Sequence, residues 1–505
     1  MAALPKDTVI AVIGAGAMGA GIAQVAAQAG YPVLVYDAKD GAAAGGIAGV
    51  GASLAKLVDK GKMAADLRQA IISRLTAVDS LAALAPAGLV IEAIVEDLAV
   101  KRSVFQQLED ILGEGAILAT NTSSISITAI ANGLKRPGRL VGMHFFNPAP
   151  LMALVEVVSG LTTDAGVAQA VYDTAAAWGK SPVHAKSTPG FIVNRVARPF
   201  YGEALRVLQE QGASVPTIDA VVKEAGGFRL GPFELMDLIG HDINFAVTNS
   251  VWRAYFNDPR YQPSLIQQEL VEAGWLGRKT GRGFYEYGGS APAPQPATAA
   301  AASRPARVAV SGPMADHPLA ARLKAAGIAL ESCPGDDAFL QADGVRLAPS
   351  DGRPATLRAA QDGIADLVLF DLALDFGSCQ RLAVSVADQA SVTALTAAAG
   401  LLQAAGIAVS LFNDVPGLIL TRTVAMLANE AAEAVHHGIA LPADVDTAML
   451  KGVGYPTGPL AWADRIGLGR VVAVLDNLQQ TYGEDRYRPS PLLRRKAAAG
   501  RGFHG

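Results

Sequence analysis

A histidine and a carboxylate lie close together in a segment of aromatic and turn-forming residues. The segment reads GMHFFNP around His144, and the tripeptide LVE follows it and ends at Glu156. A histidine beside a carboxylate is how proteins build a general base that works near neutral pH. A histidine between apolar neighbours is also typical of a packed, hydrogen-bonded core residue. At this point the segment supports both interpretations.

A glycine-rich turn near the N-terminus predicts a dinucleotide site. Residues 9–13 read as a buried strand, and a helical pattern follows to residue 30. Between them Gly14 permits a tight turn, Gly16 lets the backbone approach a pyrophosphate, and Gly19 lets helix and strand pack closely. The helix N-terminus adds amide donors. Asp37 ends the next strand, where an acid binds a ribose 2′-hydroxyl and favours NAD over NADP. The alternative is a glycine-rich turn that binds nothing.

Polar residues follow two other predicted strands. Asn121-Thr122-Ser123-Ser124 comes after the strand 117–120, and His144 also follows a strand end. Ligands of a doubly wound sheet bind at the carboxyl ends of its strands, so both segments point to one crevice. The run from Asn121 to Ser124 also suits a helix N-cap.

Hydrophobic periodicity divides the chain into five segments. We predict an NAD-binding Rossmann domain over 1–188 and a helical domain over 189–288. A Pro/Ala-rich linker follows over 289–305, then a reduced Rossmann-like domain without the glycine fingerprint over 306–412, and a second helical domain over 413–505. The fold class is α/β plus all-α.

The second helical domain is predicted from an internal repeat. PGFIVNR at 189–195 matches PGLILTR at 416–422, and Glu203, Asp219 and Asp237 match Glu430, Asp446 and Asp464. All share one offset of 227 positions. The chain therefore consists of two unequal halves.

Composition excludes several classes of protein. Hydrophobic content of 51%, charged content of 17% and a net charge of −4 indicate a globular protein without a nucleic-acid footprint. Cys333 and Cys379 give no disulfide framework, and the pair His436-His437 has no third ligand nearby, so we predict no metal site. We also predict no signal peptide, no membrane span and a cytoplasmic location.

Taken in order, these segments resemble the L-3-hydroxyacyl-CoA dehydrogenase family. The match includes GAGAMG at 14–19, NTSS at 121–124, HFFNP at 144–148, LVE at 154–156, PGFIVNR at 189–195 and GRGFY at 281–285. It covers residues 1–288. The two-half layout is similar to the long bacterial 3-hydroxyacyl-CoA dehydrogenases of phenylacetate degradation and 3-hydroxybutyryl-CoA metabolism.

The resemblance implies a mechanism of NAD-dependent oxidation to a 3-oxoacyl-CoA. His144 would take the proton from the 3-hydroxyl, and Glu156 would hold the imidazole and stabilise the imidazolium. Ser123 would bind the 3-oxygen of the acyl-CoA substrate. Asn194 would act on the thioester or the developing charge.

The resemblance also implies binding residues. Those for NAD are Gly14, Gly16, Ala17, Met18, Gly19, Asp37, Glu96, Lys101, Asn121, Ser123 and Lys279, and those for CoA are Ser53 and Lys60. For Ser53 and Lys60 the alternative is a solvated helix face, and for Lys101 and Lys279 it is a surface charge.

Three questions stay open at this stage. The acyl tail could be adipyl or butyryl; a dicarboxyl tail would need a basic residue such as Arg195, Arg198 or Arg229. A non-catalytic NAD-binding structural or regulatory protein is the alternative of another class. The family pairs its helical domains in dimers, so the duplicated domain could pair within one chain, and a homo-oligomer is also possible. Thr421 replaces Asn194 in the second half, so we expect one active site per chain.

Overall fold

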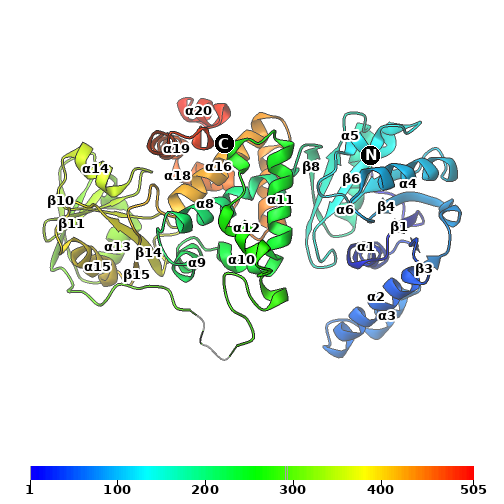
Figure 1. Ribbon diagram of the computed structural model, residues 1–505, viewed down its shortest axis with the longest axis horizontal. Coiled ribbons are helices and arrows are strands. Elements are labelled where there is room, and N and C mark those ends of the chain that lie inside the picture. The colour runs from blue at the N-terminus through cyan, green and yellow to red at the C-terminus, as the bar shows by residue number, and fades with distance from the viewer. Residues whose placement is uncertain (1, 290–291, 293) are drawn as a thin grey trace. The chain divides into compact units, whose positions relative to one another are not determined.

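The chain folds as two compact units, shown in a computed structural model (Figure 1) that describes residues 2–289, 292 and 294–505. The first unit contains the chain up to Arg195 together with residues 437–453. The second unit contains residues 196–436 and 454–505. The predicted domain boundaries stay a prediction.

An eight-stranded sheet forms the centre of the first unit, with strand order β3-β2-β1-β4-β5-β6-β7-β8. The strands are β1 (Val9–Ile13), β2 (Val33–Tyr36), β3 (Leu75–Val78), β4 (Ala87–Glu92), β5 (Ile117–Thr120), β6 (Leu140–Phe145), β7 (Leu154–Ser159) and β8 (Ser181–Lys186). Strands β1 to β6 pair in parallel, and β7 is antiparallel to β6. Because β7 reverses direction, the end of β6 pairs with the start of β7.

The first unit also contains helices. They are α1 (Ala17–Gln28), α2 (Ala42–Asp59), α3 (Ala65–Ile72), α4 (Leu98–Ile111), α5 (Ile127–Ala131), α6 (Ala165–Ala177), α7 (Val193–Val196) and, from the far end of the chain, α17 (Pro442–Gly452). Helices α2 and α3 pack as a pair after β2 (Figure 1). Helix α17 packs on β7 and β8, and the Lys186 amide donates to the Ile439 carbonyl over 2.9 Å.

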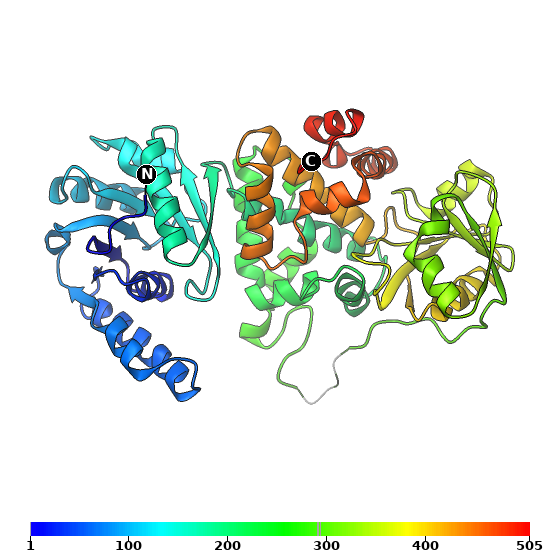
Figure 2. The same cartoon turned by 180° about the vertical axis from the view of Figure 1, so that it is seen from behind.

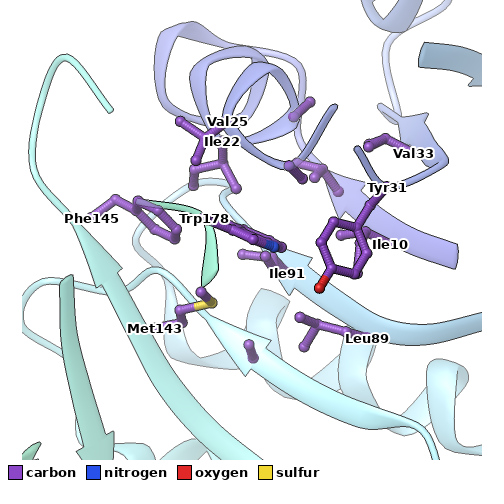
Figure 3. Close-up of a cluster of buried hydrophobic side chains, with 14 of the residues drawn as sticks. Ile10, Ile22, Val25, Tyr31, Val33, Leu89, Ile91, Met143, Phe145 and Trp178 are labelled. Carbon is purple, nitrogen blue, oxygen red and sulfur yellow. The ribbon is translucent and has the colours of Figure 1, made fainter. Parts of the chain in front are cut away.

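The core of the first unit lies between the sheet and helices α1 and α6 (Figure 3). Ile10, Ile91 and Met143 contribute from the strands and are all fully buried. Tyr31 and Trp178 pack edge to face with ring centroids 5.8 Å apart. This apolar layer fixes the strands whose carboxyl ends carry the polar residues of the candidate site.

Apolar runs predict strands at 9–13, 33–36, 89–91, 117–119 and 140–142, and these are present as β1, β2, β4, β5 and β6. Strands β3, β7 and β8 were not predicted, because Glu156, His184 and Lys186 interrupt the apolar pattern of the last two. Apolar residues recur at helical spacing from residue 192 to residue 209, and the structure has two helices there, because α7 ends at Val196 and α8 starts at Arg198. Pro199 in the first turn of α8 explains the new start, because proline fits the first turn of a helix and not its interior.

The second unit holds a mixed sheet of seven strands, with order β10-β9-β11-β12-β13-β14-β15. These strands are β9 (Arg307–Ser311), β10 (Ala329–Cys333), β11 (Phe339–Ala342), β12 (Val345–Pro349), β13 (Leu367–Phe370), β14 (Arg381–Val386) and β15 (Ala408–Leu411). Its helices are α13 (Pro318–Ala325), α14 (Ala355–Asp362) and α15 (Ala394–Ala404). Figure 2 shows this sheet, coloured yellow-green, from behind. A sheet with helices is present where the reduced Rossmann-like domain is predicted.

Two sets of helices complete the second unit. The first set is α8 (Arg198–Gln209), α9 (Val215–Glu224), α10 (Pro232–Ile239), α11 (His241–Ala254) and α12 (Leu265–Glu272). The second set is α16 (Leu420–His436), α18 (Pro459–Ile466), α19 (Leu468–Tyr482) and α20 (Pro491–Ala498). Helices α10 and α11 begin at Pro232 and His241, and α18 and α19 begin 227 positions later, at Pro459 and Leu468, so the repeat is also present in the structure.

The two sets pair through α8 and α16 in a reciprocal way. Glu203 of the first copy accepts hydrogen bonds from Arg422, Arg486 and Tyr487 of the second. Glu430 of the second copy accepts from Tyr261 of the first over 2.5 Å, and Arg260 lies 3.5 Å away. Matching residues of two copies that bind each other in this way are typical of a two-fold interface.

The predicted linker lies partly outside the described residues, at 290, 291 and 293. Its later part runs along the second sheet. The Ala299 amide donates to the Val409 carbonyl over 2.8 Å, and the Ala302 amide donates to the Gln403 side chain. No helix among the described residues is long and apolar enough to cross a membrane.

Candidate active site

The His144–Glu156 pair lies at the end of the β6–β7 ladder. The two residues are direct register partners, and the His144 Nδ1 to Glu156 Oε2 distance is 2.7 Å. His144 is 5% exposed and Glu156 is fully buried. With Nδ1 donating to the carboxylate, Nε2 is the nitrogen that can accept a proton. The antiparallel register therefore produces the base that the sequence predicted.

A tight turn holds the other oxygen of Glu156. The amides of Ile192 and Val193 both donate to Glu156 Oε1 over 3.0 Å. The turn begins with Gly190 and Phe191, whose φ angles of 76° and 46° lie in the left-handed region. Phe191 is not a glycine, so the surrounding contacts must hold it in this conformation. Glu156 thereby links the histidine to the segment that carries Asn194.

Asn194 follows directly on this segment, at the start of α7. It is half-buried, and its side chain has no hydrogen-bond partner within the described part of the chain. The same is true of the Ser123 hydroxyl, although the Ser123 amide donates to Glu96. Both side chains are therefore free to bind a ligand, as their predicted roles require.

The glycine turn has the shape that a pyrophosphate needs. A Cβ built on Gly14 would lie 2.4 Å from the Ala93 carbonyl oxygen, and one on Gly19 would lie 1.8 Å from the Gly14 oxygen. A Cβ on Gly16 would meet nothing within 4 Å, so the backbone there is open to an approaching ligand. Helix α1 starts at Ala17, with Met18 in its first turn. The Asp37 carboxylate accepts the Ala15 amide over 2.7 Å, which holds the turn against β2.

A buried charge network supports the loop after β5. The Lys101 ammonium lies 2.7 Å from Glu92 and 3.2 Å from Glu96, and Lys101 is 1% exposed. Burial opposes ionisation of Glu96, but hydrogen bonds from Thr122 and the Lys101 charge hold the pKa of Glu96 below its usual range. Lys101 is thus not a surface charge. Sequence reasoning missed Glu92, although an acid at the end of an apolar strand was a usable signal.

Glu96 and Asn121 organise that loop. One oxygen of Glu96 accepts the Thr122 hydroxyl over 2.6 Å and the amides of Ser123 and Ser124. Asn121 Oδ1 accepts the Phe145 amide over 2.8 Å, which ties β5 to the strand of His144. The structure therefore brings together Asn121, Ser123 and His144 at neighbouring strand ends.

Three further predicted binding residues lie on other elements. Ser53 is exposed on α2 and Lys60 is exposed at its C-terminal end, which fits a solvated face and a CoA contact equally. Lys279 lies in the second unit, where its ammonium pairs with Asp242. Their ligand contacts stay predictions.

Comparison with known proteins decides the family. The model of the 3-hydroxyacyl-CoA dehydrogenase NAD binding domain matches residues 9–188, and that of the C-terminal domain matches 190–287 and 417–502. The chain belongs to the 3-hydroxyacyl-CoA dehydrogenase family. The reduced Rossmann-fold domain of 3-hydroxybutyryl-CoA dehydrogenase also matches, at 347–416.

Relatives of this dehydrogenase share the whole layout. The chain is 44% identical to the 3-hydroxyadipyl-CoA dehydrogenase of Escherichia coli K12 over 98% of both chains. A crystal structure of an E. coli 3-hydroxybutyryl-CoA dehydrogenase superposes with a TM-score of 0.90 at 43% identity, covering 98% of this chain and 99% of that one. The 3-hydroxybutyryl-CoA dehydrogenase of Bradyrhizobium diazoefficiens matches 58% of this chain and 99% of its own length at 42% identity.

The second half of this dehydrogenase has a different arrangement at the corresponding position. At the offset of 227, His144 corresponds to Asp371 and Glu156 to Ala383. The Asp371 carboxylate accepts the amides of Ile419, Leu420 and Thr421 at 2.7–3.1 Å. The turn is therefore kept, but the histidine–carboxylate pair is not. Among the described residues, no group of His, Cys, Asp or Glu could hold a metal ion.

Proposed function

We propose that this dehydrogenase oxidises an L-3-hydroxyacyl-CoA to the 3-oxoacyl-CoA in its first half. The observation that supports this most strongly is the His144–Glu156 pair, whose residues are register partners on β6 and β7. Ser123 follows the neighbouring strand β5 and Asn194 follows the turn that Glu156 binds, and neither side chain has a hydrogen-bond partner among the described residues. NAD, when bound, accepts the hydride from C3 of the substrate. The residues of the chain position the substrate and move the proton.

In this proposal His144 removes the hydroxyl proton through Nε2. Its Nδ1 donates to Glu156 over 2.7 Å, which fixes the tautomer and stabilises the imidazolium that forms. The two amide bonds from Ile192 and Val193 to the other oxygen keep Glu156 from rotating away. Ser123 donates to the 3-oxygen, and the Asn194 amide group stabilises charge that develops near the thioester.

The cofactor residues are proposed on the same basis. Gly14, Gly16 and Gly19 allow the pyrophosphate to approach, and Asp37 accepts from the adenosine ribose. Glu96 and Lys101 act together, because the Lys101 charge keeps Glu96 ionised and Glu96 holds the Ser123 loop. Lys279, Ser53 and Lys60 remain proposed contacts to NAD and CoA.

For the acyl tail we propose a dicarboxyl chain, 3-hydroxyadipyl-CoA, because the full-length relative named above carries that name. The second candidate is 3-hydroxybutyryl-CoA, after the name of the full-length solved structure. The reaction would belong to fatty-acid or phenylacetate catabolism, in the cytoplasm. NADH formation from thioesters of both tails tests the proposal. If no 3-hydroxyacyl-CoA is oxidised, the non-catalytic NAD-binding role remains as the alternative.

We also propose that the duplicated helical domain replaces a dimer contact within one chain. Support comes from the reciprocal bonds of Glu203 and Glu430 across α8 and α16. Light scattering should then show a stable monomer, with any larger assembly built through other surfaces. A chain lacking 306–505 that remains a soluble, active monomer would contradict this pairing.

A further inference from the structure

Glu92 is the last residue of β4, and the proposed mechanism gives it no role. Strand β4 pairs with β1 on one side and with β5 on the other, so Glu92 is the register partner of both Ile13 and Thr120. The glycine turn follows β1, and the Ser123 loop, which comprises residues 121–124, follows β5. Glu92 therefore lies at the strand end between the segments to which we assign the cofactor and the substrate.

The carboxylate of Glu92 is fully buried, and both of its oxygens have partners. Oε1 accepts the Lys101 ammonium and the Ile94 amide, each over 2.7 Å. Oε2 accepts the Thr120 hydroxyl, also over 2.7 Å. A buried carboxylate is costly unless it is paired and hydrogen-bonded, so these three contacts hold the side chain in one position.

One route from Glu92 to the Ser123 loop runs through charged groups. Lys101 is itself buried, and its ammonium lies 3.2 Å from Glu96 Oε2. The other oxygen, Glu96 Oε1, accepts the amides of Ser123 and Ser124 at 3.0 and 3.1 Å. Glu92 therefore holds the ammonium that keeps Glu96 against the loop amides.

A second route to the same loop runs through hydroxyl groups. The Thr120 hydroxyl, which donates to Glu92, accepts the Thr122 amide over 3.3 Å. The Thr122 hydroxyl in turn donates to Glu96 over 2.6 Å. The two routes meet at Thr122 and Glu96, and both begin at the single carboxylate of Glu92.

The members of this network differ in their exposure to water. The Glu96 side chain contacts the loop directly but is 38% exposed, so water competes for its hydrogen bonds. The side chains of Lys101 and Glu92 are 1% and 0% exposed. Buried polar groups that are all satisfied make a network rigid, so the buried pair is the part that fixes the loop.

We propose that Glu92 is a positioning residue that holds the Ser123 hydroxyl in place for the 3-oxygen of the substrate. The proposal rests on the proposed function, which assigns that contact to Ser123. Glu92 does not touch the substrate and acts through Lys101 on one side and Thr120 on the other. A displacement of about 1 Å at a reacting group can lower a rate by about 100-fold, so a residue outside the crevice can have a large effect.

A double-mutant cycle between Glu92 and Ser123 is the first test. Glu92→Gln removes the charge that binds Lys101 and should lower kcat by about 10-fold, whereas Ser123→Ala should lower it by about 100-fold. Added to Ser123→Ala, the Glu92→Gln change should lower kcat by less than about twofold more, because the hydroxyl that Glu92 positions is already absent. A general structural defect would lower kcat by the same factor in both backgrounds, and that result would overturn the proposal.

Glu109→Gln is the matched control, on helix α4. The Glu109 side chain is 3% exposed, and its carboxylate accepts the amides of Lys135 and Arg136 at 2.7 and 2.9 Å, so it also holds a loop. That loop precedes β6, whereas the Ser123 loop follows the parallel strand β5, so the two loops lie at opposite ends of these strands. Glu109→Gln should lower stability and leave kcat within about twofold.

Hydrogen–deuterium exchange tests the same proposal without any turnover. In Glu92→Gln, the amides of the Ser123 loop should exchange about 10-fold faster, and those of the loop that Glu109 holds should keep their wild-type rate. Glu109→Gln should give the reverse pattern. Wild-type exchange of the Ser123 loop in Glu92→Gln would overturn the proposal.

The exchange rates also separate this proposal from the proposed function. If the wild-type protein oxidises no 3-hydroxyacyl-CoA, the proposed function fails, and exchange alone then decides whether Glu92 holds the loop. Should Glu92→Gln not fold, Thr120→Val removes the hydroxyl route alone and should make the loop amides exchange at least about threefold faster. Exchange at the wild-type rate in that variant would overturn the proposal.

Discussion

The two halves of the chain keep the same turn and use it differently. In the first half, Glu156 binds the turn amides with one oxygen and His144 with the other. In the second half, Asp371 occupies the position of the histidine, and both oxygens of its carboxylate accept amides of the turn. Ala383 stands where the glutamate would be. Both turns are therefore held by a carboxylate, and in the proposed mechanism the first half adds His144 to that carboxylate as the base.

The residue after the turn also differs between the two halves. Asn194 has no side-chain partner among the described residues, whereas the Thr421 hydroxyl at the matching position donates to Asp371 over 2.8 Å. A side chain that satisfies the fold is not available to a substrate. Among the described residues, the side chain at this position is thus unpaired in the first half and hydrogen-bonded in the second half.

The largest expected effect comes from the base itself. His144→Gln should lower kcat by about 100- to 10,000-fold, because the hydroxyl proton loses its acceptor. NAD binding should remain, since no turn residue is changed. Steady-state NADH formation and a calorimetric NAD titration measure the two quantities. His436→Gln, on an exposed end of α16, is the matched control and should keep full activity. A His144→Gln enzyme near the wild-type rate would remove the histidine from the mechanism.

The second prediction compares Asn194 and Thr421, the residues after the turn in each half. Asn194→Ala should lower kcat by about 100- to 1,000-fold, the loss expected when a preorganised donor to developing charge is removed. Thr421→Ala should leave kcat unchanged and cost about 1 kcal/mol of unfolding free energy through its lost hydrogen bond. Equal effects of both changes on kcat would mean that the position acts only through folding.

The third prediction compares the carboxylates of Glu156 and Asp371. Glu156→Gln should lower kcat by about 10-fold or more, because an amide cannot stabilise the imidazolium. Asp371→Asn should lower the unfolding free energy by about 1–3 kcal/mol, because its amide group would face backbone donors, and should leave kcat unchanged. Chemical denaturation and NADH formation on both variants measure this. A loss of turnover in Asp371→Asn at temperatures where it stays folded would contradict the division of roles.

The sequence predicted what local patterns and short motifs encode. The strand, glycine turn and helix around Gly16 follow from apolar runs and fixed spacing, and the repeat at offset 227 predicted the second helical set. It did not predict that β7 reverses direction, because Glu156 interrupts the apolar run of that strand. The burial of Lys101 also depends on distant partners, Glu92 and Glu96, which periodicity does not show.

The sequence also did not predict the packing between segments that are far apart along the chain. Helix α17 comes from the second half but packs on β8 of the first sheet, while its counterpart α9 packs on β14 of the second. Each sheet thus carries a helix of the other half's set. A Cβ on Gly452 of α17 would lie 2.5 Å from Leu154 and 3.1 Å from Val193. The second half therefore packs against Leu154 and Val193, next to Glu156 and the turn, although it has Asp371 and Ala383 where the first half has His144 and Glu156.

If the first half alone binds NAD and oxidises the substrate, the full-length chain has a single NAD site. A calorimetric titration of NAD into the purified full-length chain counts these sites. We expect one NAD per chain, and loss of that site when Gly16→Val fills the open approach to the turn. Two equivalent NAD sites per chain, or one site that survives Gly16→Val, would contradict it.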